Sequence, residues 1–304
     1  MSKLLWPVPV SRVATEKQLV AWRKAVDTGV MRSHLLEYLS MEIHDCVAIV
    51  TGGGRGIGRA ICHSLAQAGA RHVLVADLDD AAAQLVAAEI NGTAFRCDVS
   101  HEADIRKLVT CAEDVHGGLD IFVSNAGITT KGGPEVPDQE WLKLWDVNVM
   151  AHVYAARAAL PKMLERGRGY FVQVASAAGI LTEIGSAPYS VTKHAAVAFA
   201  EWLSVHYQKQ GIRVSCVCPA GVATDFLDLS DPIHQFLQMN AVSPEHVAEY
   251  VLQAIHDEHF LVLPHPEVGE FFAFKTQDYD RWLKQFARIN EKLQKKIAKM
   301  QREA

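Results

Sequence analysis

Short apolar runs rich in β-branched residues alternate with longer segments of helical periodicity from Asp45 onward. In the longer segments apolar residues recur every three or four positions, which predicts helices that bury one face. The short runs predict seven strands, at Cys46–Val50, His72–Ala76, Thr93–Cys97, Leu119–Ser124, Gly169–Ala175, Ile212–Val217 and Phe260–Leu263. Strands that are apolar throughout and alternate with helices form parallel sheets covered on both faces. We therefore expect an α/β fold with a Rossmann-type, doubly wound parallel sheet of seven strands.

One of the predicted helices is long, running from Asp138 to about Arg166, and Pro161 lies inside it. Proline lacks a backbone N–H and clashes with the preceding turn, so we expect a kink or an earlier helix end there.

Both ends of the chain are expected to add helices to a central domain at residues 43–266. Residues 1–42 contain a capping box at Thr15 and apolar residues at helical spacing, which predicts a helical extension. Residues 267–304 are aromatic and then basic, with a net charge of +6 over 281–304, which predicts an amphipathic basic helix. Its apolar stripe comprises Tyr279, Trp282, Leu283, Phe286, Ile289, Leu293, Ile297 and Met300. Such a helix either packs on its neighbour with a solvated charged face or contacts an anionic surface.

The composition is that of a globular protein: 49% of the 304 residues are hydrophobic, 21% are charged, and the net charge is −5. An acidic chain is a poor candidate for binding nucleic acid. No apolar run approaches the roughly 18 residues that a membrane span needs, and the start of the chain does not have the form of a secretory signal. None of the six cysteines forms a C-x-x-C pair, which favours free thiols in a reducing, cytoplasmic setting. The 14 histidines show no metal-ligand spacing, so no metal site is expected.

A glycine-rich turn follows the first predicted strand and precedes a helix; it reads Thr51-Gly52-Gly53-Gly54-Arg55-Gly56-Ile57-Gly58. Glycines permit a tight turn and let the backbone approach a pyrophosphate, while the helix N-terminus supplies free N–H groups. This context predicts dinucleotide binding. The alternative is a turn that is rich in glycine only for packing.

The choice of dinucleotide depends on two residues with opposite preferences. Asp77 ends the second predicted strand, where a carboxylate accepts hydrogen bonds from the adenosine ribose and repels a 2′-phosphate. Arg55 could reach such a phosphate from the glycine-rich turn. Because a buried carboxylate opposes a phosphate more than a flexible surface arginine attracts it, NAD is expected and NADP is less favoured.

Tyr189 and Lys193 lie four residues apart in a helix predicted at 188–210, so they share one face. A phenol is a poor base at neutral pH, but a nearby ammonium and a positive nicotinamide ring favour the phenolate. Tyr189 could then take the proton of an alcohol while hydride leaves for the nicotinamide. Ser176, at the carboxyl end of the fifth strand, could hold the substrate oxygen. Tyrosine and lysine at this spacing are common, and a surface tyrosine beside a solvated lysine is the alternative.

The segment from about Asp45 to Leu263 resembles the short-chain dehydrogenase/reductase (SDR) family. The resemblance rests on motifs in a fixed order: TGGGRGIG at 51–58, Asp77, Asp98-Val99, Asn125-Ala126-Gly127, Asn148, Ser176, Tyr189, Lys193, and Pro219 to Thr224. The chain departs from the family at one point. The usual Pro-Gly pair is Pro219-Ala220, with Gly221 one position later, which makes cofactor contacts in this loop less certain than those at the glycines.

The resemblance implies a role for each matched position. Tyr189 would be the catalytic acid/base, Ser176 would position the substrate oxygen, and Lys193 would bind the nicotinamide ribose. Asn148 would hold a water of a proton relay. The cofactor would also be bound or braced by Gly52, Gly56, Ile57, Gly58, Asp77, Asp98, Val99, Asn125, Ala126, Gly127, Val222 and Thr224.

Three loops at the carboxyl ends of the strands are expected to form the substrate pocket, at 129–137, 177–187 and 225–242. The third is apolar and has no arginine, which favours an apolar substrate over an anionic one; its apolar residues are Phe226, Leu227, Leu229, Ile233, Phe236, Leu237 and Met239. Family members usually assemble through the helices that hold Asn148 and Tyr189, which implies a homodimer or homotetramer. The large apolar residues on these helices are Trp141, Trp145, Val149, Phe199, Trp202 and Tyr207.

The sequence thus predicts an NAD-dependent oxidoreductase that interconverts an apolar secondary alcohol and a ketone. An NADPH-dependent 3-oxoacyl or carbonyl reductase is the other enzymatic interpretation. A non-catalytic dinucleotide-binding sensor or scaffold is the alternative of another class, although such a protein gains nothing from Tyr189 and Lys193 in register.

Overall fold

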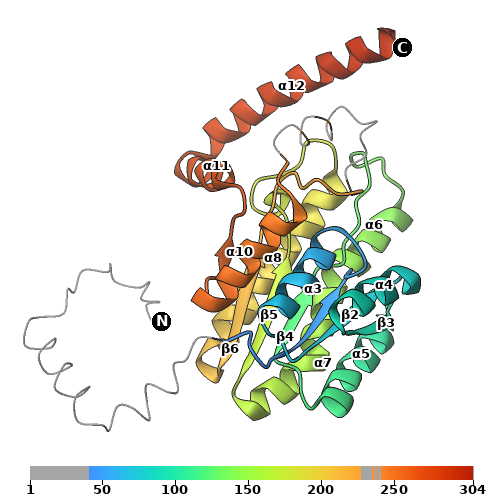
Figure 1. The fold of residues 1–304 in the computed structure, drawn as a ribbon. Helices are drawn as coiled ribbons and strands as arrows, with labels where there is room; N and C mark the ends of the chain where they lie inside the picture. The colour runs from blue at the N-terminus through green and yellow to red at the C-terminus, as the bar shows by residue number, and fades with distance from the viewer. Residues whose placement is uncertain (1–40, 227–234, 236–237, 239–240, 304) are drawn as a thin grey trace, which may run out of the picture. The chain divides into compact units, whose positions relative to one another are not determined.

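The computed structural model describes residues 41–226, 235, 238 and 241–303, with side chains as far as Ala298. The N-terminal extension predicted at 1–42 lies outside these residues, apart from its last two. In the described part, seven parallel strands form one sheet in the order β3-β2-β1-β4-β5-β6-β7 (Figure 1). The predicted doubly wound α/β fold is confirmed.

The strands are β1 (Val47–Thr51), β2 (His72–Asp77), β3 (Thr93–Arg96), β4 (Ile121–Ser124), β5 (Gly169–Val174), β6 (Ile212–Val217) and β7 (Leu261–Val262). The α-helices between and after them are α3 (Gly56–Gln67), α4 (Asp80–Ile90), α5 (Glu102–His116), α6 (Asp138–Trp145), α7 (Ala151–Arg166), α8 (Ala187–Tyr207), α10 (Pro244–Asp257), α11 (Pro266–Gln277) and α12 (Tyr279–Glu303).

Successive residues of each strand point to opposite faces of the sheet, so the apolar strands feed two separate cores. In β1, Val47 and Ile49 pack into the core beneath α5, α7 and α8. Ala48 and Val50 pack into the other core, beneath α3, α4 and α10. Because β1 is buried on both faces, its residues from Val47 to Val50 are all apolar rather than alternating.

The strand order reverses its direction at β1, which pairs with β2 on one side and β4 on the other. In an open parallel sheet, ligands bind beyond the carboxyl ends of the strands at such a switch point. The segments that follow β1, β2, β4, β5 and β6 all start at this edge.

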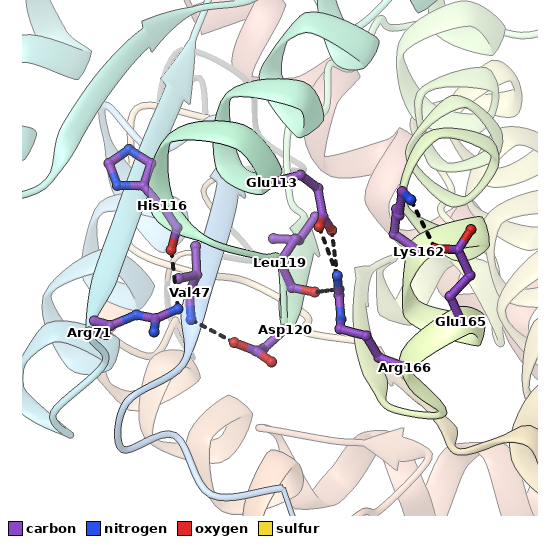
Figure 2. Close-up of polar contacts among 9 residues, drawn as sticks. All are labelled: Val47, Arg71, Glu113, His116, Leu119, Asp120, Lys162, Glu165 and Arg166. Carbon is purple, nitrogen blue, oxygen red and sulfur yellow. Dashed lines mark hydrogen bonds and ion pairs between the residues drawn. The ribbon is translucent and has the colours of Figure 1, made fainter.

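Polar contacts tie helices to the opposite, amino-terminal edge of the sheet (Figure 2). Val47 N donates to Asp120 Oδ2 across 2.9 Å, which joins the start of β1 to the start of β4. Arg166 donates to the Leu119 carbonyl and pairs with Glu113, which links α7 to α5. These contacts therefore join β1 to β4 and α7 to α5 at the amino-terminal edge of the sheet.

The long helix predicted at 138–166 is interrupted by one π-helical turn, η2 (Asp146–Met150), between α6 and α7. The helix does not end at Pro161, which lies within α7. The irregular turn instead contains Asn148, and π-helical turns in α-helices are frequent at functional sites.

Residues 266–303 form two helices where one was predicted. Asp278 separates α11 from α12, and its side-chain Oδ1 accepts a hydrogen bond from Arg281 N across 3.0 Å. Asp278 thus caps the start of α12, and aspartate is among the preferred N-cap residues.

No described helix combines the length and apolar character that a membrane crossing requires. The described residues also contain no group of three or more histidine, cysteine, aspartate or glutamate side chains arranged to hold a metal ion.

Candidate active site

A cavity of about 1710 Å³ lies along the carboxyl edge of the sheet. Of the predicted site residues, the cavity is lined by Gly52, Arg55, Gly56, Ile57, Asp77, Asp98, Val99, Asn125, Ala126, Gly127, Ser176, Tyr189, Lys193, Val222 and Thr224. Gly58 and Asn148 do not line it; both are buried behind residues that do. The fold therefore brings residues from the ends of six strands to one cavity.

The glycine-rich turn has the geometry of a cradle for a phosphate group. Gly52 and Gly56 have φ angles of +63° and +50°, which side chains with a Cβ rarely adopt. A Cβ on Gly58 would lie 2.0 Å from the Gly52 carbonyl oxygen, so this position must stay bare for α3 to pack on the turn. Arg55 precedes α3 without capping it by a side-chain hydrogen bond, which leaves the N–H groups of the first turn for a ligand.

Asp77 holds the glycine-rich turn from the end of β2 and is only 6% exposed. Its Oδ2 accepts from Gly54 N across 2.9 Å, and its Oδ1 accepts from Asp79 N across 3.0 Å. Each carboxylate oxygen retains a lone pair at the cavity. The residue after it, Leu78, also lines the cavity and offers no cation to a 2′-phosphate.

Asn125 braces the sheet from the end of β4. Its Nδ2 donates to the carbonyls of Thr51 and Gly52, across 2.9 and 3.2 Å, and its backbone N donates to Thr51 Oγ1. These bonds fix the glycine-rich turn relative to β4. Asp98, after β3, is held by Ser100, whose hydroxyl donates to Oδ1 across 2.6 Å.

Tyr189 is held in the first turn of α8 and is buried. Ser186 caps this helix, its Oγ accepting from Tyr189 N across 3.1 Å, and Pro188 suits the first turn. One turn later, Lys193 is buried with its Nζ 5.6 Å from the centre of the Tyr189 ring and 3.1 Å from the Val174 carbonyl oxygen. Ser176 comes from the end of β5 and hydrogen-bonds to Tyr189.

The pKa values of Tyr189 and Lys193 are shifted mainly by their burial away from water. Burial raises the pKa of Tyr189 above its usual range, Glu183 raises it further, and the hydrogen bond with Ser176 lowers it. Burial lowers the pKa of Lys193 to about 8. The residues alone therefore keep the phenol protonated, so a phenolate needs a further positive charge in the cavity.

Asn148 lies in the π-helical turn and is completely buried. Its Oδ1 accepts from Ile128 N and its Nδ2 donates to the Ile128 carbonyl, both across 2.9 Å. Nδ2 also donates to Thr192 Oγ1, one residue before Lys193. Asn148 thus fixes the loop after β4 beside Gly127, where a Cβ would come within 3.3 Å of both Asn148 Oδ1 and Lys193 Nζ.

His265 fixes the loop in which the chain departs from the family pattern. Its Nδ1 accepts from Ala220 N across 3.2 Å, so its Nε2 carries the hydrogen and donates to the Gly221 carbonyl across 2.9 Å. His265 was not among the predicted site residues, because a lone histidine before Pro266 carries no local signal of its partner 45 residues away.

The cavity is lined by residues of the predicted substrate loops, such as Leu181 and Phe226, and by residues outside those loops. The Phe226 ring centre lies 5.9 Å from that of Tyr189. The other apolar residues predicted for this loop lie outside the described residues. Phe271 of α11 and Phe286 of α12 also line the cavity, and neither was a predicted site residue.

The predicted subunit-contact residues differ in accessibility. Trp145 and Trp202 are exposed to solvent, whereas Val149 is buried in the core of its own chain and leaves no surface for a partner. Phe199 is half-buried and packs against the core beneath α8.

Comparisons with known proteins agree on one family. A family profile described as short chain dehydrogenase matches residues 46–253. The chain is 33% identical over 251 residues to 1-deoxy-11-beta-hydroxypentalenate dehydrogenase of Streptomyces exfoliatus, covering 80% of this chain and 90% of that protein. It is 39% identical over 190 residues to sex determination protein tasselseed-2 of Zea mays, but the match covers 60% of this chain and only 56% of the maize protein. The crystal structure of an SDR from Burkholderia phymatum in complex with NAD aligns with a TM-score of 0.73 at 26% identity, covering 79% of this chain and 96% of that one.

Proposed function

Because the chain belongs to the short-chain dehydrogenase/reductase family of oxidoreductases, we propose that it is an NAD-dependent dehydrogenase that interconverts an apolar secondary alcohol and a ketone. The observation that carries the proposal is the meeting of Tyr189, Ser176 and Lys193 in the cavity that also contains the glycine-rich turn and Asp77. A protein that only bound a dinucleotide would have no use for this trio.

The cavity residues fit a nicotinamide dinucleotide. Gly52 and Gly56 present backbone to the cavity at the N-terminus of α3, where a pyrophosphate could bind, and the bare Gly58 behind them lets α3 pack on the turn. Asp77 offers its remaining lone pairs to ribose hydroxyls, and its negative charge opposes a 2′-phosphate. Arg55 is exposed to solvent by comparison, so we propose NAD as the preferred cofactor.

When bound, an oxidised nicotinamide would supply the hydride acceptor and a positive charge. Tyr189 would take the proton of the substrate hydroxyl, because the Lys193 ammonium and this added charge offset the burial that raises the pKa of the phenol. Ser176 would hold the substrate oxygen through its hydroxyl. Asn148 and Thr192 would keep the Lys193 turn of α8 in position beside Gly127.

An apolar substrate is supported by the side chains that surround Tyr189. Phe226, Leu181 and Ile128 line the same cavity as its hydroxyl, and Glu183 is the acidic residue of the neighbouring loop. A wall of this kind excludes water and favours the binding of apolar groups on the substrate.

We also propose a homodimer or homotetramer that works in the cytoplasm. The exposed Leu142, Trp145, Trp202 and Val205 give α6 and α8 apolar surface for a symmetric contact. All six cysteines are free, as suits a reducing compartment.

The test is oxidation of a panel of secondary alcohols of increasing apolar size, followed by nicotinamide absorbance, with NAD and NADP compared at equal concentration. The wild-type chain should turn over with NAD at least tenfold faster than with NADP. Tyr189→Phe should lose at least a thousandfold in kcat while its NAD affinity stays within twofold. Preference for NADPH with a ketone would favour the carbonyl reductase interpretation, and NAD binding without turnover on any alcohol or ketone would favour the sensor.

A further inference from the structure

Lys275, near the end of α11, is a buried cation that binds a distant loop. It is 6% exposed, and its Nζ donates to the carbonyl oxygens of Ile180 and Leu181 across 2.7 and 3.0 Å. Lysine is almost never buried unless its charge has partners, because removing the ammonium from water costs several kcal/mol. The two carbonyls lie about 95 residues earlier in the chain, so the bonds connect separate elements.

Two aromatic rings of α12 cover this ammonium. Lys275 Nζ lies 4.9 Å from the centre of the Trp282 ring and 5.3 Å from that of Tyr279. A cation over an aromatic face gains electrostatic attraction, more so when it is desolvated. Trp282 is itself buried, so α11, α12 and the loop after β5 meet at one packed point.

The loop that Lys275 holds belongs to the active site. Ser176 begins it, and Leu181 lines the cavity. The two helices that supply the clamp also supply cavity wall, because Phe271 of α11 and Phe286 of α12 line the same cavity. Phe271 is 54% exposed, so it both lines the cavity and contacts solvent.

We propose that α11 and the first turns of α12 form the outer wall of the substrate pocket, that Lys275 fixes this wall to the loop after β5, and that Phe271 and Phe286 set the size of apolar substrate accepted. The proposal rests on the proposed function for the identity of the substrate, but the clamp itself does not. Phe271 and Phe286 are then specificity-determining residues, and Lys275 is a positioning residue.

The clamp is tested without any substrate by hydrogen–deuterium exchange of the full chain. Lys275→Met should speed exchange in residues 177–187 at least tenfold, because the loop loses its anchor. Lys284→Met, the same change at an exposed position of α12, should leave that exchange unchanged. Lys275→Arg, which keeps charge and donors, should restore most of the protection. Equal exchange in Lys275→Met and wild type would overturn the clamp.

The wall is tested by the selectivity of kcat/KM along a series from 2-butanol to 2-decanol with NAD. Phe271→Ala and Phe286→Ala should each shift the ratio of long to short alcohols at least fivefold, through KM rather than kcat. Leu283→Ala removes an exposed apolar side chain of α12 that does not line the cavity, and its ratio should match wild type. An unchanged ratio in both phenylalanine variants would overturn the wall. If the wild-type chain oxidised no alcohol, the proposed function would fail, while the exchange result would still decide the clamp.

Discussion

Asn148 Nδ2 donates a hydrogen bond to Thr192 Oγ1 across 3.1 Å, and this bond joins the π-helical turn to the helix that carries Tyr189 and Lys193. The Thr192 hydroxyl lies 2.9 Å from the Pro188 carbonyl oxygen and 3.1 Å from that of Tyr189, so it donates its hydrogen within α8 and accepts from Asn148. Thr192 therefore transmits the position of the π-helical turn to the turn of α8 that holds the proposed catalytic pair.

Replacing Thr192 tests this link. Thr192→Val keeps the side-chain volume but removes the acceptor, which leaves part of a buried amide without a partner at a cost of about 1–3 kcal/mol. We expect kcat to fall about tenfold, with KM for NAD nearly unchanged, and the free energy of unfolding to drop by that amount. Thr192→Ser should behave as wild type, and a fully active Thr192→Val would show that Asn148 needs no support from α8. Steady-state kinetics and urea unfolding measure both effects.

His152 should make the fold sensitive to acid. Its imidazole is buried on α7 and hydrogen-bonded to Gln173, and burial, with help from Lys193, lowers its pKa from 6.5 to about 4. In the unfolded chain the ring takes up a proton near pH 6.5, whereas the folded chain does so only near pH 4. Stability is therefore lost as the pH falls from 6.5 to 4, by about 3 kcal/mol from this group. The measurement is urea unfolding of wild type and His152→Gln across this range. The difference between them should shrink toward low pH; a constant difference would contradict the assignment.

Asp77 should control the choice between the two dinucleotides. Asp77→Asn removes the charge that opposes a 2′-phosphate, so the preference for NAD over NADP in kcat/KM should fall at least tenfold. Because an amide has one oxygen where the carboxylate has two, either Gly54 N or Asp79 N loses its partner, and the melting temperature should fall by several degrees. Asp79→Asn, the same change at an exposed residue outside the cavity, should leave the preference unaltered. Unchanged preference in Asp77→Asn would assign discrimination to another residue.

His265 should determine how tightly the loop after β6 binds the cofactor. His265→Phe preserves a ring of similar size but removes the acceptor for Ala220 N and the donor for the Gly221 carbonyl. We expect KM for NAD to rise at least fivefold because Val222 and Thr224 follow these residues directly. His256→Phe, at an exposed histidine of α10, is the matched control. Equal KM in both variants would mean that the loop keeps its shape without His265.

The fold could be predicted because its signals are local. The central strands are mainly apolar, and the crossover helices carry their own periodicity, so the order of elements follows without knowledge of distant contacts. The same holds for the glycine-rich turn and for the spacing of Tyr189 and Lys193. Chain direction in a parallel sheet then places the residues after each strand at one edge.

What could not be predicted depends on contacts between distant segments. The π-helical turn around Asn148 arises where α6 and α7 must both pack, and the sequence of 138–166 shows no break there. The partners of His265 and Lys275 lie 45 and about 95 residues away. The sequence predicts that Lys193 and a positive nicotinamide ring favour the Tyr189 phenolate, but it does not reveal the burial of the ring, which raises the pKa of the phenol. Pro161 predicted a kink or an earlier helix end, and α7 continues through it to Arg166, so the earlier end was wrong.

The extra backbone residue in the turn at 146–150 constrains how this enzyme can change over evolutionary time. Removing one residue would restore a regular helix, but it would also rotate everything on one side of the deletion by about 100°. Leu144 and Ala155 lie on either side of the turn and are buried in different hydrophobic clusters. After such a rotation they could not both remain buried. Single-residue deletions in this turn should prevent folding, whereas substitutions at the exposed Asp146 should be tolerated.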